Sequence, residues 1–152
     1  MKDEKYGAGE ILLAIQQEIV ATKSKVNTFG KFNYRSCEDI LVALKPILAK
    51  HNATIYLTDS VHTCGDNMPY VNAKAVFMII GQDDMKLTAQ AQAGIGPVGG
   101  MSISQQFGSA SSYARKYALA GLLLLDDNKD DDTRSNIDIK ETAKAIIDDG
   151  GI

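Results

Sequence analysis

Residues 107–132 read FGSASSYARKYALAGLLLLDDNKDDD, and this stretch determines the predicted fold. Ala, Ser, Arg, Lys and Leu dominate it, and no proline occurs between Met101 and Leu125, so the composition predicts a long helix. Spacings of three and four residues define an apolar, mostly small seam on one helix face: Phe107, Ala110, Ala114, Tyr117, Gly121 and Leu124. Such a seam predicts a closely packed partner and leaves Arg115 and Lys116 on a polar flank.

The partner of this helix is predicted from the strands that precede it. Residues 53–63 (ATIYLTDSVHT) and 69–81 (PYVNAKAVFMIIG) flank the turn sequence CGDNMP and predict a long hairpin, and residues 85–93 (MKLTAQAQA) predict a third antiparallel strand. One face of this sheet is apolar, whereas the other carries Lys74, Lys86 and amides. The fold class is therefore α+β, with a hairpin and a third strand packed against a long helix.

N-terminal helices are expected to complete this core. Residues 10–26 have amphipathic spacing, and residues 36–52 (SCEDILVALKPILAKHN) begin with Ser36 as a helix cap, followed by two acidic residues in the first turn. Pro46 lies inside the second helix and should kink or split it, because proline lacks the backbone N–H of a helical hydrogen bond.

Two shorter segments connect these elements. Residues 29–36 (FGKFNYRS) predict a short strand with Lys31 and Arg35 on one face, opposite Phe32 and Tyr34, which would form a basic edge. Residues 94–100 (GIGPVGG) predict a loop, for which a plain connector and a functional loop both stay open. The GxGxxG spacing in that loop does not indicate a dinucleotide site, because no βαβ unit surrounds it.

Charge is distributed unevenly along the 152 residues. Residues 1–125 hold 12 Lys or Arg and 10 Asp or Glu, whereas residues 126–152 hold 4 and 9, and the net charge is −3. We therefore expect one core domain over 1–125 and an acidic C-terminal tail over 126–152.

Composition also narrows the location and the chemistry. No apolar run approaches the length that crosses a bilayer, and the N-terminus lacks a secretory layout, so we expect a cytoplasmic protein without membrane contact. Cys37 and Cys64 have no CxxC partner, and His51 and His62 are isolated, so we predict free thiols and neither a metal nor a cofactor.

The residues alone leave three possible functions open. Single-stranded nucleic acid is held by cations and by aromatic rings on which bases stack. The chain offers both kinds of side chain, in Lys31, Tyr34, Arg35, Tyr70, Lys74, Lys86, Tyr113, Arg115 and Lys116. A metal-dependent nuclease would instead use the aspartates of residues 126–132, but neighbouring aspartates in one loop splay apart, so we do not expect an enzyme. The third alternative is an assembly module that binds protein alone.

Two blocks of the sequence resemble a known family. GSASSYARKYALAGLLLLDDNKDDD is similar to the signature of the Erf (essential recombination function) family of bacteriophage single-strand annealing proteins. The upstream block KFNYRSCEDILVALKPILAKH resembles a second block of that family, including the proline at Pro46. The resemblance spans Glu10 to Asp132.

The resemblance implies a β-β-β-α core that binds single-stranded DNA and anneals complementary strands during recombination in the bacterial host, without ATP. It also implies self-assembly into rings or helical filaments. The pair Arg115 and Lys116 matches the basic pair of the family helix and is expected to contact phosphates, and Tyr113 matches its aromatic position. Longer relatives carry a C-terminal region for partners, so a host single-strand binding protein is a further candidate partner.

Overall fold

The structure, a computed structural model, describes residues 6–97 and 99–125. The elements run in the order α1 (Ala8–Glu18), β1 (Lys25–Asn27), β2 (Phe32–Tyr34), α2 (Cys37–Lys50), β3 (Ala53–Cys64), β4 (Met68–Ile79), β5 (Gln82–Gly94) and α3 (Ile103–Leu123). Strands β1 and β2 form a small antiparallel hairpin, and β3, β4 and β5 form an antiparallel sheet in that order. The predicted α+β class is confirmed, as are the hairpin, the third strand and the long helix.

The alternation of side chains along β4 gives the sheet two different faces. Ala75 lies opposite Leu57 of β3 and Ala89 of β5, so apolar residues share the inner face. Four residues of β4 on this face are at most 2% exposed: Val71, Ala73, Ala75 and Phe77. The turn to β5 uses Gly81 at φ 82°, a conformation that glycine adopts without steric cost. The alternation predicted from the sequence is therefore confirmed.

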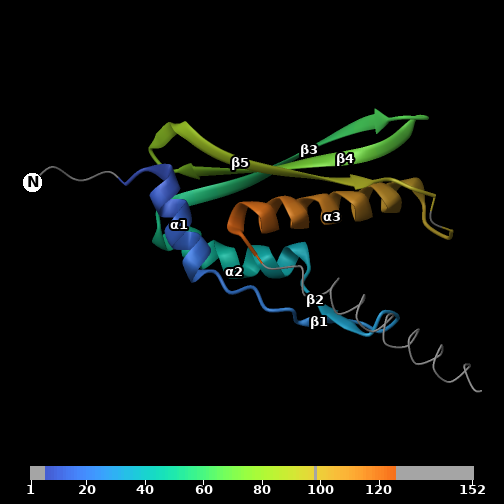
Figure 1. Cartoon of the computed structure of the whole chain (residues 1–152), viewed down its shortest axis with the longest axis horizontal. Helices are drawn as coiled ribbons and strands as arrows, with labels where there is room; N and C mark the ends of the chain where they lie inside the picture. Colours follow the sequence, from blue (N-terminus) through green and yellow to red (C-terminus); the bar gives the residue numbers. More distant parts are fainter. Residues whose placement is uncertain (1–5, 98, 126–152) are drawn as a thin grey trace, which may run out of the picture.

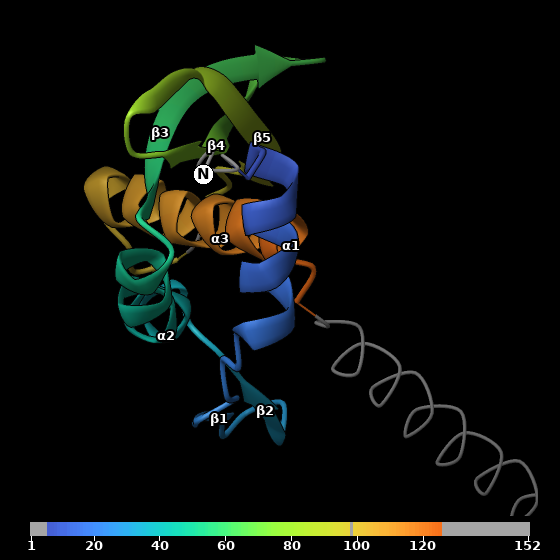
Figure 2. The same cartoon turned by 90° about the vertical axis from the view of Figure 1, so that its left-hand side faces the viewer.

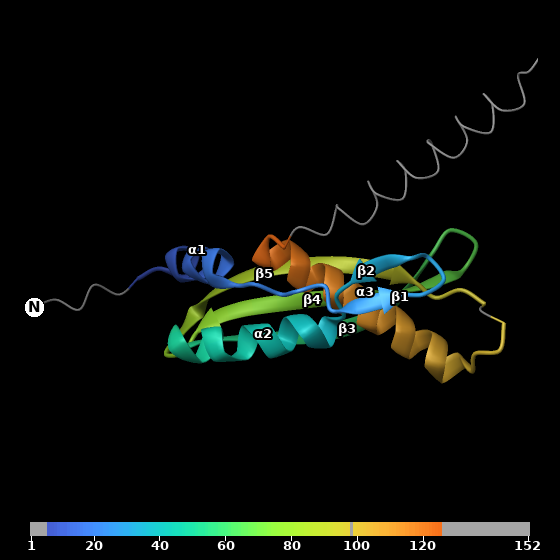
Figure 3. The ribbon, with the colours of Figure 1, turned by 90° about the horizontal axis from the view of Figure 1, so that it is seen from below.

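Helices cover the inner face in two layers. Helix α3 lies against the sheet, and α2 lies on the side of α3 away from the sheet (Figures 1 and 2). Helix α1 crosses near the end of α3, where the side-chain amide of Gln16 donates a hydrogen bond of 2.8 Å to the carbonyl of Leu122. Seen from below, α2 and the β1–β2 hairpin follow one another under α3 (Figure 3). No described helix covers the outer face of the sheet.

Helix α3 buries a different set of residues from the predicted seam. Ala110 and Ala114 are at most 5% exposed, as predicted, and Ala118, which lies outside the predicted seam, is also buried. Tyr117 and Leu124, however, are 46% and 74% exposed, so their assignment to the seam was wrong. Because α3 lies between the sheet and α2, its C-terminal half buries a second face: Leu119, Leu122 and Leu123. A single apolar stripe cannot represent a helix that packs on two sides.

The N-terminal elements differ from prediction in their bounds. The first helix ends at Glu18 and not near residue 26, and the chain continues in extended conformation into β1, a strand that we did not predict. Helix α2 begins as expected: Ser36 Oγ accepts a hydrogen bond of 3.2 Å from the backbone N–H of Asp39. Pro46 lies inside this one helix, so of the two effects considered for it, a kink or a split, the split does not occur.

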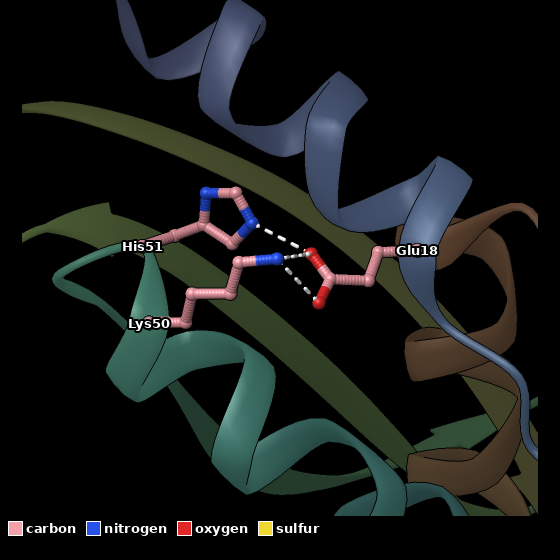
Figure 4. A network of polar contacts seen from close by, with 3 residues as sticks. All are labelled: Glu18, Lys50 and His51. Atoms are coloured by element: carbon pink, nitrogen blue, oxygen red, sulfur yellow. Dashed lines mark hydrogen bonds and ion pairs between the residues drawn. The ribbon is translucent and has the colours of Figure 1, made fainter.

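The C-terminal ends of α1 and α2 are joined by a polar cluster (Figure 4). Lys50 Nζ lies 2.9 Å from Glu18 Oε1, and His51 Nε2 lies 2.9 Å from Glu18 Oε2. The hydrogen bond from His51, followed by that from Lys50, lowers the pKa of the Glu18 carboxyl below its ordinary value. The cluster therefore favours the ionised carboxylate.

The two thiols have different environments. Cys37 is buried at the start of α2, and this burial, followed by the charge of Glu38, raises the pKa of its thiol. Cys64 is exposed at the end of β3. Among the helices that the structure describes, none is long and apolar enough to span a membrane.

Candidate nucleic-acid interface

The outer sheet face consists of the alternate residues of 54–62, 70–78 and 86–92 that point away from α3. It presents Lys74, opposite Gln90, and Lys86, opposite Met78, among Thr, Ser, Asn and Gln side chains. His62 and Tyr70 stack on it with ring centroids 5.5 Å apart. None of these alternate residues is acidic, so the outer sheet face is cationic, polar and partly aromatic.

A second surface runs along α3, and we define this tyrosine flank as Tyr113, Lys116 and Tyr117. Tyr113 is 57% exposed, and its ring centroid lies 6.4 Å from that of Tyr117. Lys116 Nζ lies 5.3 Å from the centre of the Tyr117 ring, within the range of a cation–π contact. A lysine and two accessible rings thus occupy neighbouring turns of one helix.

Arg115 lies on the other side of α3, where it contacts β3. Its Nε lies 3.0 Å from Oδ1 and 2.9 Å from Oδ2 of Asp59, and the same carboxylate accepts a hydrogen bond from Ser111. Although burial raises the pKa of the Asp59 carboxyl, the hydrogen bonds from Arg115 and Ser111 hold that pKa below its ordinary value. The charge of Arg115 is therefore neutralised within the fold, unlike that of Lys116.

The predicted basic edge at β2 does not form. Lys31 is exposed in the turn before β2 at φ 54°, whereas Arg35 follows the strand and is only 7% exposed. Tyr34, at the end of β2, is half-buried. The prediction that Lys31 and Arg35 share one strand face was wrong, because only residues 32–34 are paired in the strand.

A cavity of about 200 Å³ lies between the end of β5 and the first half of α3. Strand β5 contributes Ala93 and Gly94, and the following loop contributes Gly96 and Met101. Helix α3 contributes Gln106, Ser109, Ala110 and Tyr113. We call this hollow the β5–α3 cavity. Through Tyr113 it is continuous with the tyrosine flank.

Strand β5 connects both surfaces. Its residues Lys86, Thr88, Gln90 and Gln92 belong to the outer sheet face, and Ala93 and Gly94 line the cavity beside Tyr113. Because β5 is an edge strand of the sheet, the outer sheet face and the tyrosine flank border the same edge. A linear ligand that follows β5 can therefore contact both.

Comparison with known proteins adds the family. The family model described as the ERF superfamily matches residues 9–149. The chain belongs to the ERF superfamily.

A curated relative supports this assignment. The chain is 39% identical over 134 residues to the "Essential recombination function protein" of Salmonella phage P22, and the match covers 88% of the chain. It spans 63% of the length of that relative. No solved structure matches the chain. The resemblance inferred from the two sequence blocks is confirmed.

The described part of this ERF-superfamily chain gives no support to a metal site. No group of three or more His, Cys, Asp or Glu is placed to hold an ion among the described residues. The aspartates of residues 126–132, on which the nuclease alternative depends, lie outside the described residues. The division between a core over 1–125 and an acidic tail over 126–152 stays a prediction for the same reason.

Sequence reasoning missed several participants in these sites. Asp59 is far from Arg115 along the chain, and no local pattern indicated their contact. Gln106 was not singled out, and Ser109 was placed only on the polar flank of the helix, because a cavity depends on three segments that only the fold brings together. Tyr117 was assigned to the core by its spacing, although Tyr113, which was placed among the DNA-binding residues, lies four residues earlier and therefore on the same helix face.

Proposed function

We propose that the chain binds single-stranded DNA and anneals complementary strands in phage homologous recombination, without ATP and as an oligomeric ring or filament. The observation that carries this proposal is membership of the ERF superfamily, together with the similarity to a phage protein named for essential recombination function. Annealing requires no bond chemistry, so the absence of a recognisable catalytic set in the sequence agrees with it.

The surface chemistry of the described residues supports this ligand. Phosphates are attracted by accessible cations. Lys74 of β4 and Lys86 of β5 are exposed on the outer sheet face, and Lys116 of the tyrosine flank is half-buried beside the Tyr117 ring. Tyr113 and Tyr117 offer rings on which unpaired bases can stack, and stacking does not depend on base sequence. Lys31 is a further exposed cation in the β1–β2 turn.

Self-assembly is the second part of the proposal. The net charge is −3, so a single copy has no net electrostatic attraction to DNA and depends on a few local cations, whereas a row of copies multiplies the number of phosphate contacts on one strand. Exposed apolar side chains on the helical side support contacts between copies; they include Leu13, Val20, Phe29, Val42 and Leu124.

An annealing assay tests the proposal. Two complementary oligonucleotides, one with a fluorophore and one with a quencher, are mixed with the full chain in EDTA without ATP. We expect duplex formation faster than the spontaneous rate, with the acceleration lost at high salt. A rate equal to the spontaneous one at low salt would contradict the proposal, and light scattering of the same samples reports the assembly.

A further inference from the structure

The phosphate contacts proposed for Lys74, Lys86 and Lys116 do not involve the β5–α3 cavity. Resting on that proposed function, we propose that this cavity receives one neutral nucleobase of the bound single strand, stacked against the ring of Tyr113. Each subunit would then hold one base out of line while its neighbours along the strand stay accessible for pairing.

The size of the cavity limits the ligand to a fragment. Its volume is about 200 Å³, below the roughly 300 Å³ at which sites for drug-sized molecules begin. It is also several times the roughly 30 Å³ that one water molecule occupies in the liquid. A single heterocycle satisfies both limits, whereas a complete nucleotide with its sugar and phosphate does not.

The lining excludes a charged group and favours a flat ring with polar edges. No charged side chain lines the cavity in the described part of the chain. Ala93, Ala110 and Met101 provide apolar contact, and the Tyr113 ring provides a stacking partner. No cation among the described residues lines the cavity to pair with a phosphate, so the base is the part of a nucleotide that suits this lining.

Polar groups in the lining match the edge of a base. The Gln106 side chain donates one hydrogen bond of 3.1 Å to the carbonyl of Met101. This bond fixes the amide in place and leaves its second N–H and its carbonyl oxygen available for a ligand. Ser109 lines the same space, and a serine hydroxyl can both donate and accept. Because these groups suit several donor and acceptor patterns, the cavity accepts different bases.

The surroundings place a phosphate next to the base. Lys116 lies one turn along α3 from Tyr113, outside the cavity, where a cation can meet the backbone that enters or leaves. Tyr117, 6.4 Å from Tyr113 between ring centroids, can stack the following base. The strand would therefore run along α3 beside the edge of β5.

The experiment compares two ligands and two variants of the full chain. The ligands are an oligothymidine and an oligomer of equal length whose sugars carry no bases. Ser109→Leu fills the cavity with a good helix former, and Ser112→Leu makes the same change at an exposed α3 position outside the cavity. Tyr113→Leu, which removes the ring at the cavity mouth, is a second test. Circular dichroism verifies folding of each variant.

We expect wild type and Ser112→Leu to bind the oligothymidine more tightly than the baseless oligomer. Ser109→Leu and Tyr113→Leu should weaken binding of the oligothymidine roughly tenfold, a factor typical of base–aromatic stacking, without weakening binding of the baseless oligomer. If Ser109→Leu and Tyr113→Leu keep the full preference for bases, the cavity is not a base site, although DNA binding itself stands. If they change only the assembly in light scattering, the cavity is a contact between copies and the proposal is overturned. If wild type binds neither oligomer, the proposed function fails first.

Discussion

Arg115 and Lys116 are neighbours of like charge on α3 with opposite surroundings. The guanidinium of Arg115 is held by Asp59 of β3, whereas the ammonium of Lys116 lies over an exposed ring. Because they are adjacent in the sequence, they were predicted to contact phosphates as one basic pair. Their different partners arise because successive residues of a helix point about 100° apart. We therefore expect Arg115 to contribute mainly to stability and Lys116 mainly to DNA binding.

Replacing each of the two residues with alanine tests this separation. Arg115→Ala should lower the free energy of unfolding by about 1 kcal/mol, because the ion pair with Asp59 is only partly shielded from water. Lys116→Ala should change it by less than about 0.5 kcal/mol and reduce the salt dependence of single-strand binding by about 0.7 in logarithmic slope. Urea unfolding and salt titrations measure the two quantities. A reduced slope for Arg115→Ala at unchanged stability would assign the arginine to DNA contact instead.

The Glu18 cluster predicts a pH dependence of stability. The folded pKa of Glu18 is lowered from its ordinary 4.5, so its contribution is fully present above the unfolded pKa and disappears as pH falls through the folded pKa. Glu18→Gln should therefore melt at a lower temperature than wild type at neutral pH, and the difference should shrink in acid. Thermal melting followed by circular dichroism gives both values. Asp84→Asn, at an exposed carboxylate in β5, serves as the control.

At the scale of elements, the alanine face of α3 sets how close the helix lies to the sheet. Ala114 and Ala118 are fully buried, and the inner face of the sheet also carries alanines among its larger apolar residues, including Ala73, Ala75 and Ala89. A β-carbon added at Gly121 would lie 4.0 Å from that of Ala89, which is ordinary van der Waals contact. Small residues on both sides therefore bring the two backbones close together, and a larger side chain there has no space.

Ala114→Leu tests this packing. We expect the free energy of unfolding to fall by about 1–3 kcal/mol, because added methylene groups in a well-packed core force shifts of the surrounding structure. Ser112→Leu introduces the same side chain at an exposed position of the same helix and should change stability by less than about 0.5 kcal/mol. If both variants lose the same free energy of unfolding, the loss comes from introducing leucine into the helix and not from lack of space at Ala114.

The sequence predicted the elements whose apolar residues recur with a clear period. It did not predict contacts between residues that lie far apart along the chain. Alternation along β4 and β5 placed Lys74 and Lys86 on the outer face, since every second residue of a strand shares a face. The end of α1 was misplaced because Ile19 and Val26 continue the apolar spacing and no glycine or proline marks the stop. The burial of Arg35 and the pairing of Arg115 with Asp59 depend on tertiary contacts that no local period encodes.

For the whole molecule, the important arrangement is that the outer sheet face and the tyrosine flank meet along β5. The described helices lie on the inner side of the sheet, and none of them covers the outer face (Figure 1). In the proposed function, a strand of DNA that follows this edge would meet Lys86 of β5 and Lys116 of α3, and the bases that the tyrosines do not hold would stay accessible. Such accessibility is a requirement for annealing, because bases must be tested by a second strand.

Removing the two outer lysines tests this arrangement. The double variant Lys74→Ala/Lys86→Ala should reduce the logarithmic salt slope of single-strand binding by about 1.4 per subunit if both lysines contact phosphate, since each contact on a single strand contributes about 0.7. Lys45→Ala, at an exposed position on α2, should leave the slope unchanged. Fluorescence anisotropy of a labelled oligonucleotide measures the slopes. If the double variant does not change the salt slope, the outer sheet face does not contact the DNA, and the tyrosine flank is left as the binding surface.

Because the two thiols differ in accessibility, the number of copies in an assembly can be counted by labelling. Cys64 is accessible at the tip of the β3–β4 hairpin, whereas Cys37 is shielded and its raised pKa keeps it in the unreactive thiol form. A maleimide dye will thus attach at one position of the natural sequence, with no cysteine engineered in or out. Stepwise photobleaching of single particles then gives the stoichiometry directly, and energy transfer between dyes reports how far apart neighbouring hairpin tips stand.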